Sequence, residues 1–306
     1  MKVGIDIGGT KCAVILGDTN GIVKKIRFDT KDYQETMKNI RCAVRDMGDF
    51  DAIGISCGGP LDSKRGIILS PPNLPGWDDI HITEMLSQEF GVPAYLCNDA
   101  DACALAEWKF GAGRGTENMI FLTFGTGMGA GLILNGKLYS GACGMAGEVG
   151  HVRMSEFGPV GYGKSGSFEG FCSGGGIAQI GKMLAREQIQ MGKKLPYCKT
   201  LAELDGITAK SLAEYANMGD ETALAAYRIC GEMLGKGLAL LIDILNPERI
   251  VIGSVFARAE ALLRPHMEKT LKREALVFSY KTCQIVPAAL GDAIGDYAAL
   301  AVAENH

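Results

Sequence analysis

The chain has 306 residues, which is long enough for one large domain or two medium domains with well-filled cores. Hydrophobic residues make up 47% of it and charged residues 22%, values that are ordinary for a globular protein. A net charge of −4, without a long run of Lys or Arg, argues against a nucleic-acid partner.

The sequence also argues against secretion and against a membrane partner. The first ten residues contain one lysine and no uninterrupted apolar segment, unlike a signal peptide. The longest apolar run, at 238–245, is broken by Asp243 and is too short to span a bilayer. Ten cysteines follow no regular spacing, so we expect reduced thiols in a cytoplasmic protein.

The chain opens with two predicted strands, 2–7 and 12–17, which are joined by a turn of Gly8, Gly9, Thr10 and Lys11. Such a hairpin offers backbone N–H groups and a lysine to phosphates, but it could equally be an ordinary hairpin with a solvated lysine. Asp6 beside the turn would repel a phosphate unless a metal ion lay between them. A third strand is predicted near 21–29.

An amphipathic helix is predicted over 35–47, and a strand over 52–57 runs into a tight turn containing Gly59. A Pro-rich loop at 71–77 follows. Its Asn73 is either a ligand-binding amide or an Asx-turn residue, and the sequence does not separate the two.

Asp99 lies where a strand at 92–96 passes into a helix over 99–110. Strand-to-helix turns in α/β proteins open onto the ligand crevice, so this carboxylate is a candidate catalytic group. The alternative is that Asp99 only caps the helix.

Residues 111–118 are rich in glycine and predict a flexible joint and a domain boundary. The opening pattern then returns, with a strand at 119–124, a Gly-Thr turn containing Thr126 and Gly127, and a strand at 129–134. This repetition suggests two related halves that face one cleft. The Gly-rich run leads into a strand and lacks the spacing GxGxxG, which excludes a Rossmann dinucleotide site.

Three polar residues stand out after this repeat. Glu148 and His151 are bracketed by glycines, a pattern more typical of ligand-facing residues than of core residues. Glu169 lies between aromatic residues and is either a buried acceptor or simply exposed.

The remaining segments predict structural elements. Helices are expected over 212–218, 221–245, 257–272 and 291–303, and strands over 249–252, which ends at Gly253, and 283–286.

Two Gly-Thr turns and a carboxylate at a strand end suit phosphoryl transfer. That chemistry needs N–H donors and a metal for the phosphates, and one carboxylate to take the proton from an acceptor hydroxyl. A Walker motif and the protein-kinase motifs are both missing from the sequence, so the fold would be a different one.

The sequence resembles the ROK family of sugar kinases, in the actin/hexokinase-like ATPase superfamily. The resemblance rests on motifs that run in family order along almost the whole chain: DIGGTK (6–11), PPNLPGW (71–77), CNDADACALAE (97–107), FGTGMGAGLILNGKLYSG (124–141), GEVGH (147–151) and NPERIVIG (246–253). Repressors of the family carry an N-terminal winged-helix segment; this chain opens at the first strand, which disfavours that class.

The resemblance implies an α/β, two-lobed actin-like fold made of two ribonuclease H-like domains. We expect an N-terminal lobe over 1–112, with the helix at 292–306 packing back on it, and a larger C-terminal lobe over 113–291. Family habit suggests a homodimer.

The resemblance also assigns roles. Asp99 would be the general base that deprotonates the sugar hydroxyl. The sugar would be bound by Gly59, Asn73, Asn98, Glu148, His151 and Glu169. Asp6 would hold Mg²⁺ through water, and the ATP would be contacted by Gly8, Gly9, Thr10, Lys11, Thr126, Gly127 and Gly253.

One departure from the family concerns zinc. The family pattern CxCGxxGCxE supplies three cysteines that bind a structural zinc together with the histidine, but here the three positions hold Val160, Tyr162 and Ser167. Valine cannot ligate, and serine or neutral tyrosine are poor substitutes for a thiolate. Cys143 and Cys172 lie nearby in sequence and could in principle rebuild a site, but we expect no zinc.

The predicted substrates are ATP with Mg²⁺ and a hexose, foremost glucose at its 6-hydroxyl. The alternatives are N-acetylmannosamine, N-acetylglucosamine, fructose, allose or a β-glucoside. An alternative of another class is a sugar-sensing protein that has lost turnover.

Overall fold

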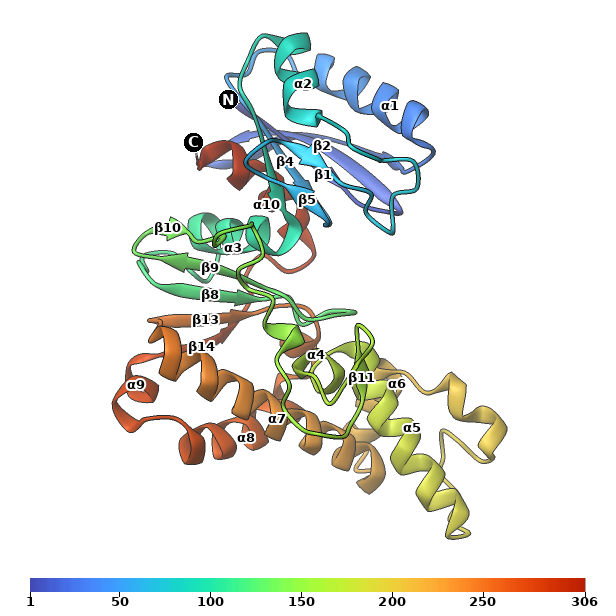
Figure 1. The fold of residues 1–306 in the computed structure, drawn as a ribbon. Coiled ribbons are helices and arrows are strands. Elements are labelled where there is room, and N and C mark those ends of the chain that lie inside the picture. The colour runs from blue at the N-terminus through green and yellow to red at the C-terminus, as the bar shows by residue number, and fades with distance from the viewer. Residues whose placement is uncertain (306) are drawn as a thin grey trace. The chain divides into compact units, whose positions relative to one another are not determined.

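The structure is a computed structural model that describes residues 1–305 and separates into two compact units (Figure 1). The first unit comprises Met1–Phe121, Gly131–Ala146 and the C-terminal segment from Ala288, and the second comprises Leu122–Ala130 and Gly147–Pro287. The lobe boundaries expected from the sequence stay a prediction.

The first unit is built on a five-stranded sheet with the order β3-β2-β1-β4-β7. Its strands are β1 (Lys2–Ile7), β2 (Lys11–Asp18), β3 (Gly21–Asp29), β4 (Ile53–Cys57) and β7 (Ala94–Asn98). The hairpin of β1 and β2 is antiparallel, with Ile7 opposite Cys12, whereas β1, β4 and β7 run parallel. The predicted opening hairpin and third strand are confirmed, and the carboxyl ends of the parallel strands share one edge of the sheet.

Helices cover both faces of this sheet. Apolar residues of α1 (Tyr33–Arg45) and α2 (Ile82–Phe90) pack with Ile5 and Ile55 in one core cluster. The opposite face meets α10 (Ile294–Glu304), which follows a short 3₁₀ turn, Gly291–Ala293 (Figure 1). α3 (Asp99–Phe110) packs beside α10.

The segment predicted to be a flexible joint is instead firmly held. The fully buried Glu107 accepts backbone hydrogen bonds from Ala112 at 2.7 Å and Leu290 at 2.9 Å. The Trp108 indole donates to the Thr116 carbonyl at 2.7 Å. The glycines here therefore allow close packing around a buried carboxylate, a long-range contact that composition alone does not reveal.

Short strands complete the first unit. The pairs are antiparallel: β5 (Leu61–Asp62) with β6 (Ile67–Ile68), and β9 (Ala130–Leu134) with β10 (Lys137–Leu138). β8 (Met119–Leu122) runs up to the start of the second unit.

The second unit is mainly helical. Its strands are the parallel pair β13 (Arg249–Ile252) and β14 (Gln284–Pro287) and the hairpin of β11 (Val160–Gly161) and β12 (Lys164–Ser165). Its helices are α4 (Phe168–Phe171), α5 (Gly174–Gln190), α6 (Ala209–Asn217), α7 (Glu221–Leu245), α8 (Val255–Glu274) and α9 (Val277–Thr282), with 3₁₀ turns at Val149–His151 and Leu201–Gly206.

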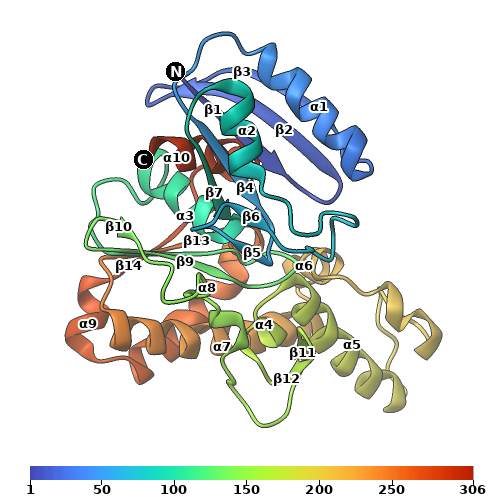
Figure 2. The same cartoon turned by 45° about the horizontal axis from the view of Figure 1, so that its top comes forward.

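The longest helix of the second unit, α7, coincides with the predicted range 221–245. It packs along α8, where Gly231 and Gly235 let the two backbones approach (Figure 2). A Cβ on Gly235 would lie 2.4 Å from the Met267 carbonyl oxygen, so larger residues are excluded from this helix contact.

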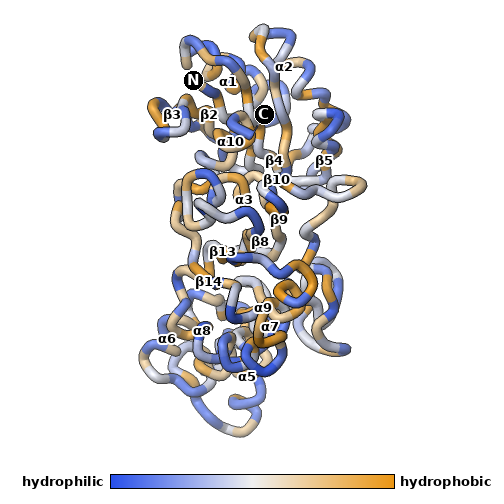
Figure 3. The backbone as a smooth tube through the Cα atoms, turned by 90° about the vertical axis from the view of Figure 1, so that its left-hand side faces the viewer, coloured by the Kyte–Doolittle hydropathy of each residue, from blue (hydrophilic) through white to orange (hydrophobic). Residues whose placement is uncertain are grey.

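Hydrophobic and hydrophilic stretches alternate along the chain (Figure 3). Among the helices of residues 1–305, none combines the length and the apolar character needed to cross a bilayer.

Candidate active site

The junction of β7 and α3 presents two polar side chains, Asn98 and Asp99. Asn98 is the N-cap of α3, and its side chain accepts the Ala100 N–H at 3.0 Å. Asp99 occupies the first helical position, where its Oδ1 accepts the same N–H at 2.8 Å. The N-cap is therefore Asn98 rather than Asp99, so the capping alternative for Asp99 is not supported. The hydrogen bond to Ala100 uses only Oδ1 of the Asp99 carboxylate.

The surroundings of Asp99 favour proton transfer. Burial raises the pKa of its carboxyl, while the hydrogen bonds from backbone N–H groups partly oppose that rise. A Cβ built on Gly58 would lie 3.9 Å from Asp99 Oδ2, and one on Gly59 would lie 3.4 Å from the Asn98 side-chain nitrogen. The glycine turn after β4 thus leaves room beside both polar groups, where an acceptor hydroxyl could approach.

The Gly-Thr turn between β1 and β2 has its predicted form. The Gly8 N–H donates to the Lys11 carbonyl at 3.1 Å, and the Thr10 carbonyl accepts from Thr30 at 3.0 Å. A Cβ on Gly9 would lie 2.6 Å from the Asn73 carbonyl oxygen, so the Pro-rich loop packs directly against this turn. Asn73 and the turn are brought together, and Lys11 is exposed.

Asp6, near the end of β1, is largely buried and has two other carboxylates nearby. Burial, helped by Asp296 and Asp99, raises its pKa to about 7. Asp296 is itself paired with Lys25, and the backbone of Gly295 packs against Asp6, where a Cβ would come within 2.9 Å of Oδ2. A carboxylate whose ionised form is disfavoured in this way suits a divalent cation, because the cation would restore its charge balance.

In the second unit, Glu169 and the second Gly-Thr turn lie together. Glu169 is in the first turn of α4, and its Oε2 accepts the Met128 N–H at 3.0 Å. A Cβ on Gly127 would lie 2.7 Å from the same oxygen. Of the two interpretations of Glu169, the structure supports the acceptor.

Glu148 precedes the 3₁₀ turn Val149–His151 and His151 ends it, and both residues are exposed. The His151 ring meets the Tyr162 ring edge-on, with centroids 5.1 Å apart, and its carbonyl accepts a hydrogen bond from Lys164 at 2.6 Å. Gly147 has φ of +90° and lies tightly against the Ala130 carbonyl, so the turn requires glycine there.

The second unit also contains a cavity of about 780 Å³ that the sequence did not predict as a whole. Its wall includes one residue predicted to bind ATP, Thr126, and the neighbour of another, Ser254, which follows Gly253. The residues missed are chiefly Gly174, Gly175, Lys210, Glu214, Asn217 and Arg258. The run Ser173–Gly176, which begins α5 with a serine cap, was the one local signal for this wall.

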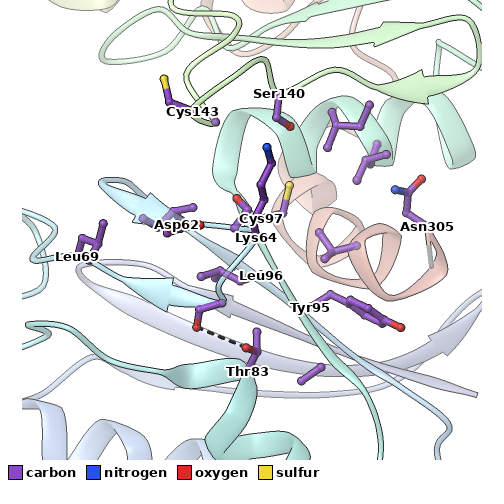
Figure 4. Close-up of a pocket in the computed structure, with 18 of the residues that line it drawn as sticks. Asp62, Lys64, Leu69, Thr83, Tyr95, Leu96, Cys97, Ser140, Cys143 and Asn305 are labelled. Atoms are coloured by element: carbon purple, nitrogen blue, oxygen red, sulfur yellow. Dashed lines mark hydrogen bonds between the residues drawn. The ribbon is translucent and has the colours of Figure 1, made fainter.

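A cavity of about 770 Å³ lies in the first unit (Figure 4). Its wall combines Tyr95, Leu96 and Cys97 of β7 with Lys64 and Asn305. None of the residues predicted to bind ATP or sugar lines it.

Comparisons with known proteins agree with the motifs. The sequence profile of the ROK family matches residues 2–306. The glucokinase of Thermotoga maritima is 33% identical over 282 residues, which is 88% of this chain and 86% of that protein.

Solved structures match along the whole chain as well. A ROK-family glucokinase from Streptomyces griseus, solved with glucose and AMPPNP, superposes with a TM-score of 0.75 at 29% identity, covering 100% of this chain and 99% of the other. A ROK-family transcriptional regulator, homologous to the E. coli MLC protein, gives a TM-score of 0.82 at 25% identity, covering 98% of this chain and 76% of the other.

Proposed function

The chain belongs to the ROK family, and we propose that it is an ATP-dependent hexose kinase that phosphorylates the 6-hydroxyl of glucose or a similar aldohexose. The family resemblance seen in the motifs is confirmed, and the fold is the two-lobed actin-like ATPase fold of that family. The glucokinase relatives favour glucose over the alternative acceptors N-acetylmannosamine, N-acetylglucosamine, fructose, allose and β-glucosides.

The observation that carries this proposal is the carboxylate of Asp99, which lies at the first position of α3 and has a raised pKa. Asp99 accepts the proton of the sugar hydroxyl while the hydroxyl oxygen bonds to the γ-phosphorus, and the bond from that phosphorus to the bridging oxygen of ADP breaks. A positioned base of this kind contributes about 10²–10⁴ in rate. Its raised pKa makes the carboxylate a stronger base than a solvated aspartate.

The cavity of the second unit is the proposed nucleotide site. Its Gly174 and Gly175 open α5, and the N-terminus of a 17-residue helix attracts phosphate groups. Thr126 belongs to the same wall, and Gly253 directly precedes Ser254 in it. The turn Gly8–Lys11 supplies further N–H groups and the Lys11 ammonium for phosphate in our proposal.

We propose that Asp6 holds the Mg²⁺ that accompanies ATP. Its burial and the neighbouring Asp296 and Asp99, which raise its pKa to about 7, support this role. When bound, the ion neutralises phosphate charge and favours an ionised Asp6.

We propose a set of residues that contact the sugar. The supporting features are the free amide of Asn98, the open turn at Gly59 and the carboxylate of Glu169. The other proposed sugar contacts are Asn73, Glu148 and His151. We also propose a cytoplasmic homodimer that binds neither nucleic acid nor membranes; the ten free cysteines are consistent with a reducing compartment.

The alternative from another class is a sugar-sensing protein without turnover. The similarity to a transcriptional regulator supports this alternative. The arrangement of Asp99 favours the kinase, because a sensor has no use for a base beside the sugar hydroxyl.

The test replaces the base without changing its shape. Asp99→Asn is expected to lower turnover about 10²–10⁴-fold, while calorimetry shows glucose affinity within a few-fold of the unaltered protein. Asp101→Asn, on the same helix and hydrogen-bonded to Ser140, is the matched control and should keep its turnover. Undiminished turnover of Asp99→Asn would refute the assignment of the base.

A further inference from the structure

The segment at 155–167 occupies the place where the family resemblance implies a structural zinc, and its residues do not fit that metal. Val160 has no donor atom, and Tyr162 is 82% exposed with its ring against His151. Ser167 Oγ is buried and caps α4, accepting the Gly170 N–H at 3.1 Å. Within residues 1–305, no three His, Cys, Asp or Glu side chains are grouped as metal ligands.

Hydrogen bonds hold the segment instead. The short hairpin of β11 and β12 is closed by the Gly166 N–H, which donates to the Pro159 carbonyl at 2.9 Å. The Ser165 hydroxyl donates to the Gly158 carbonyl at 3.0 Å, and the Met154 N–H donates to the Gly166 carbonyl at 2.8 Å. These bonds fold the segment onto itself and onto the residue just before it.

Two side-chain hydrogen bonds tie the hairpin to the residues before it, from Lys164 to the His151 carbonyl and from Arg153 to the Ser165 carbonyl. The side chain that ties it to α5 is Gln179. Its Nε2 donates to the Val160 carbonyl at 2.8 Å, and its Oε1 accepts the Val160 N–H at 2.9 Å. The amide thus pairs with both backbone groups of one residue, as a neighbouring strand would, and so fixes position and rotation together. Val160 stands at the first of the three positions that hold cysteine in the family pattern.

The fastened hairpin in turn supports α4. A Cβ on Gly161 would lie 2.6 Å from the Gly170 nitrogen and 2.8 Å from Glu169 Cβ, so the hairpin backbone packs against the first turn of α4. Displacing the hairpin would therefore displace Glu169, whose carboxylate accepts the Met128 N–H.

We infer that this loop is braced without a metal, and that Gln179 is the positioning residue that holds Glu169 in its sugar-binding place through the hairpin of β11 and β12. The role in sugar binding rests on the proposed function, whereas the metal-free brace stands without it.

The test is Gln179→Leu, which keeps the size of the side chain and removes both hydrogen bonds. We expect the glucose KM and the calorimetric glucose Kd to rise about tenfold, in line with the loss of two hydrogen bonds, while kcat and the KM for ATP stay within about twofold. Gln179→Glu keeps an oxygen that accepts the Val160 N–H but loses the donor. Its glucose KM and Kd should therefore lie between those of the unaltered protein and those of Gln179→Leu. Gln190→Leu, on the exposed last turn of the same helix, is the matched control.

Two further measurements separate the brace from the proposed function. Hydrogen exchange of the amides at 158–161 should quicken in Gln179→Leu but not in Gln190→Leu, whatever the chain phosphorylates. Elemental analysis should find no stoichiometric zinc, and treatment with a zinc chelator followed by restored Mg²⁺ should leave the glucose Kd unchanged.

The inference would be overturned by unchanged exchange and unchanged glucose Kd in Gln179→Leu, or by one zinc per chain whose removal weakens glucose binding. If the unaltered protein binds no sugar, the proposed function fails, and the exchange measurement alone still decides whether Gln179 braces the loop.

Discussion

Asp99 shows how one side chain combines function with a cost in stability. Desolvation raises the pKa of its carboxyl, and a raised pKa makes the carboxylate a stronger base for the proton transfer that we propose. Keeping an ionised carboxylate there disfavours the folded state, because the unfolded chain would solvate it.

The pH dependence of turnover follows from this shift. We expect kcat to fall toward acid as Asp99 becomes protonated, with an apparent pKa above 3.8, the ordinary value for aspartate. The measurement is kcat at saturating ATP and glucose between pH 4 and pH 9. A rate that stays flat down to the ordinary aspartate range would contradict the raised pKa.

The same shift predicts the stability of Asp99→Asn. Because the folded-state pKa is raised, the native protein is relatively favoured below the ordinary pKa and loses that advantage as the pH rises through the raised value. At pH 8 the Tm of the asparagine variant should therefore equal or exceed the Tm of the unaltered protein. At pH 4 the Tm of the variant should not exceed that of the unaltered protein. Thermal unfolding without ligands at the two pH values measures this, and a variant that is less stable at pH 8 would contradict it.

Individual residues could be predicted only as far as local sequence reaches. The strand-to-helix junction identified Asp99, but which neighbour caps the helix depends on side-chain rotation, and Asn98 proved to be the cap. The contact of Glu169 with Met128 spans 41 positions, and the clamp of Gln179 on Val160 spans 19. Local sequence patterns do not predict contacts between residues that are so far apart in the sequence.

The docking of α10 on the first sheet is the clearest case of element packing in the chain. Gly4 of β1 and Gly54 of β4 face this helix, and a Cβ on Gly54 would lie 2.3 Å from both the Ala299 carbonyl oxygen and the Ala303 nitrogen. Both contacts are with backbone atoms of a helix, which cannot swing aside as a flexible side chain can.

Gly54→Ala is therefore expected to lower the free energy of unfolding by about 1–3 kcal/mol, because the helix must move outward. Gly206→Ala is the matched control, since a Cβ there meets nothing within 4 Å, and its change should stay within about 0.5 kcal/mol. Chemical denaturation measures both. Equal stability of the two variants would show that the tight contact of α10 does not hold in solution.

Periodicity predicted most of the elements, including α7 at its observed bounds and the opening hairpin. It failed where tertiary contacts decide. The glycines of 111–118 suggested flexibility, yet two side chains of α3 hold that segment: Glu107 accepts the Ala112 N–H, and Trp108 donates to the Thr116 carbonyl. The helix predicted at 257–272 is confirmed as α8 at Val255–Glu274, which includes Pro265.

The complete chain is needed for the proposed reaction, because each unit supplies different chemistry. The base Asp99 and the proposed cation ligand Asp6 belong to the first unit, whereas the nucleotide cavity and Glu169 belong to the second. The motifs from which these roles were predicted run through the full length of the chain. The cavity wall could not be predicted as a set, because it gathers residues from α5, α6 and α8.

The most direct measurement is a coupled ADP-release assay with the full chain, ATP and Mg²⁺ against a panel of hexoses, hexosamines and β-glucosides. We predict turnover with glucose or another aldohexose, and loss of that turnover in Asp99→Asn. Silence across the panel, combined with calorimetric binding of one of the sugars, would contradict the kinase and establish a sugar-binding protein in its place.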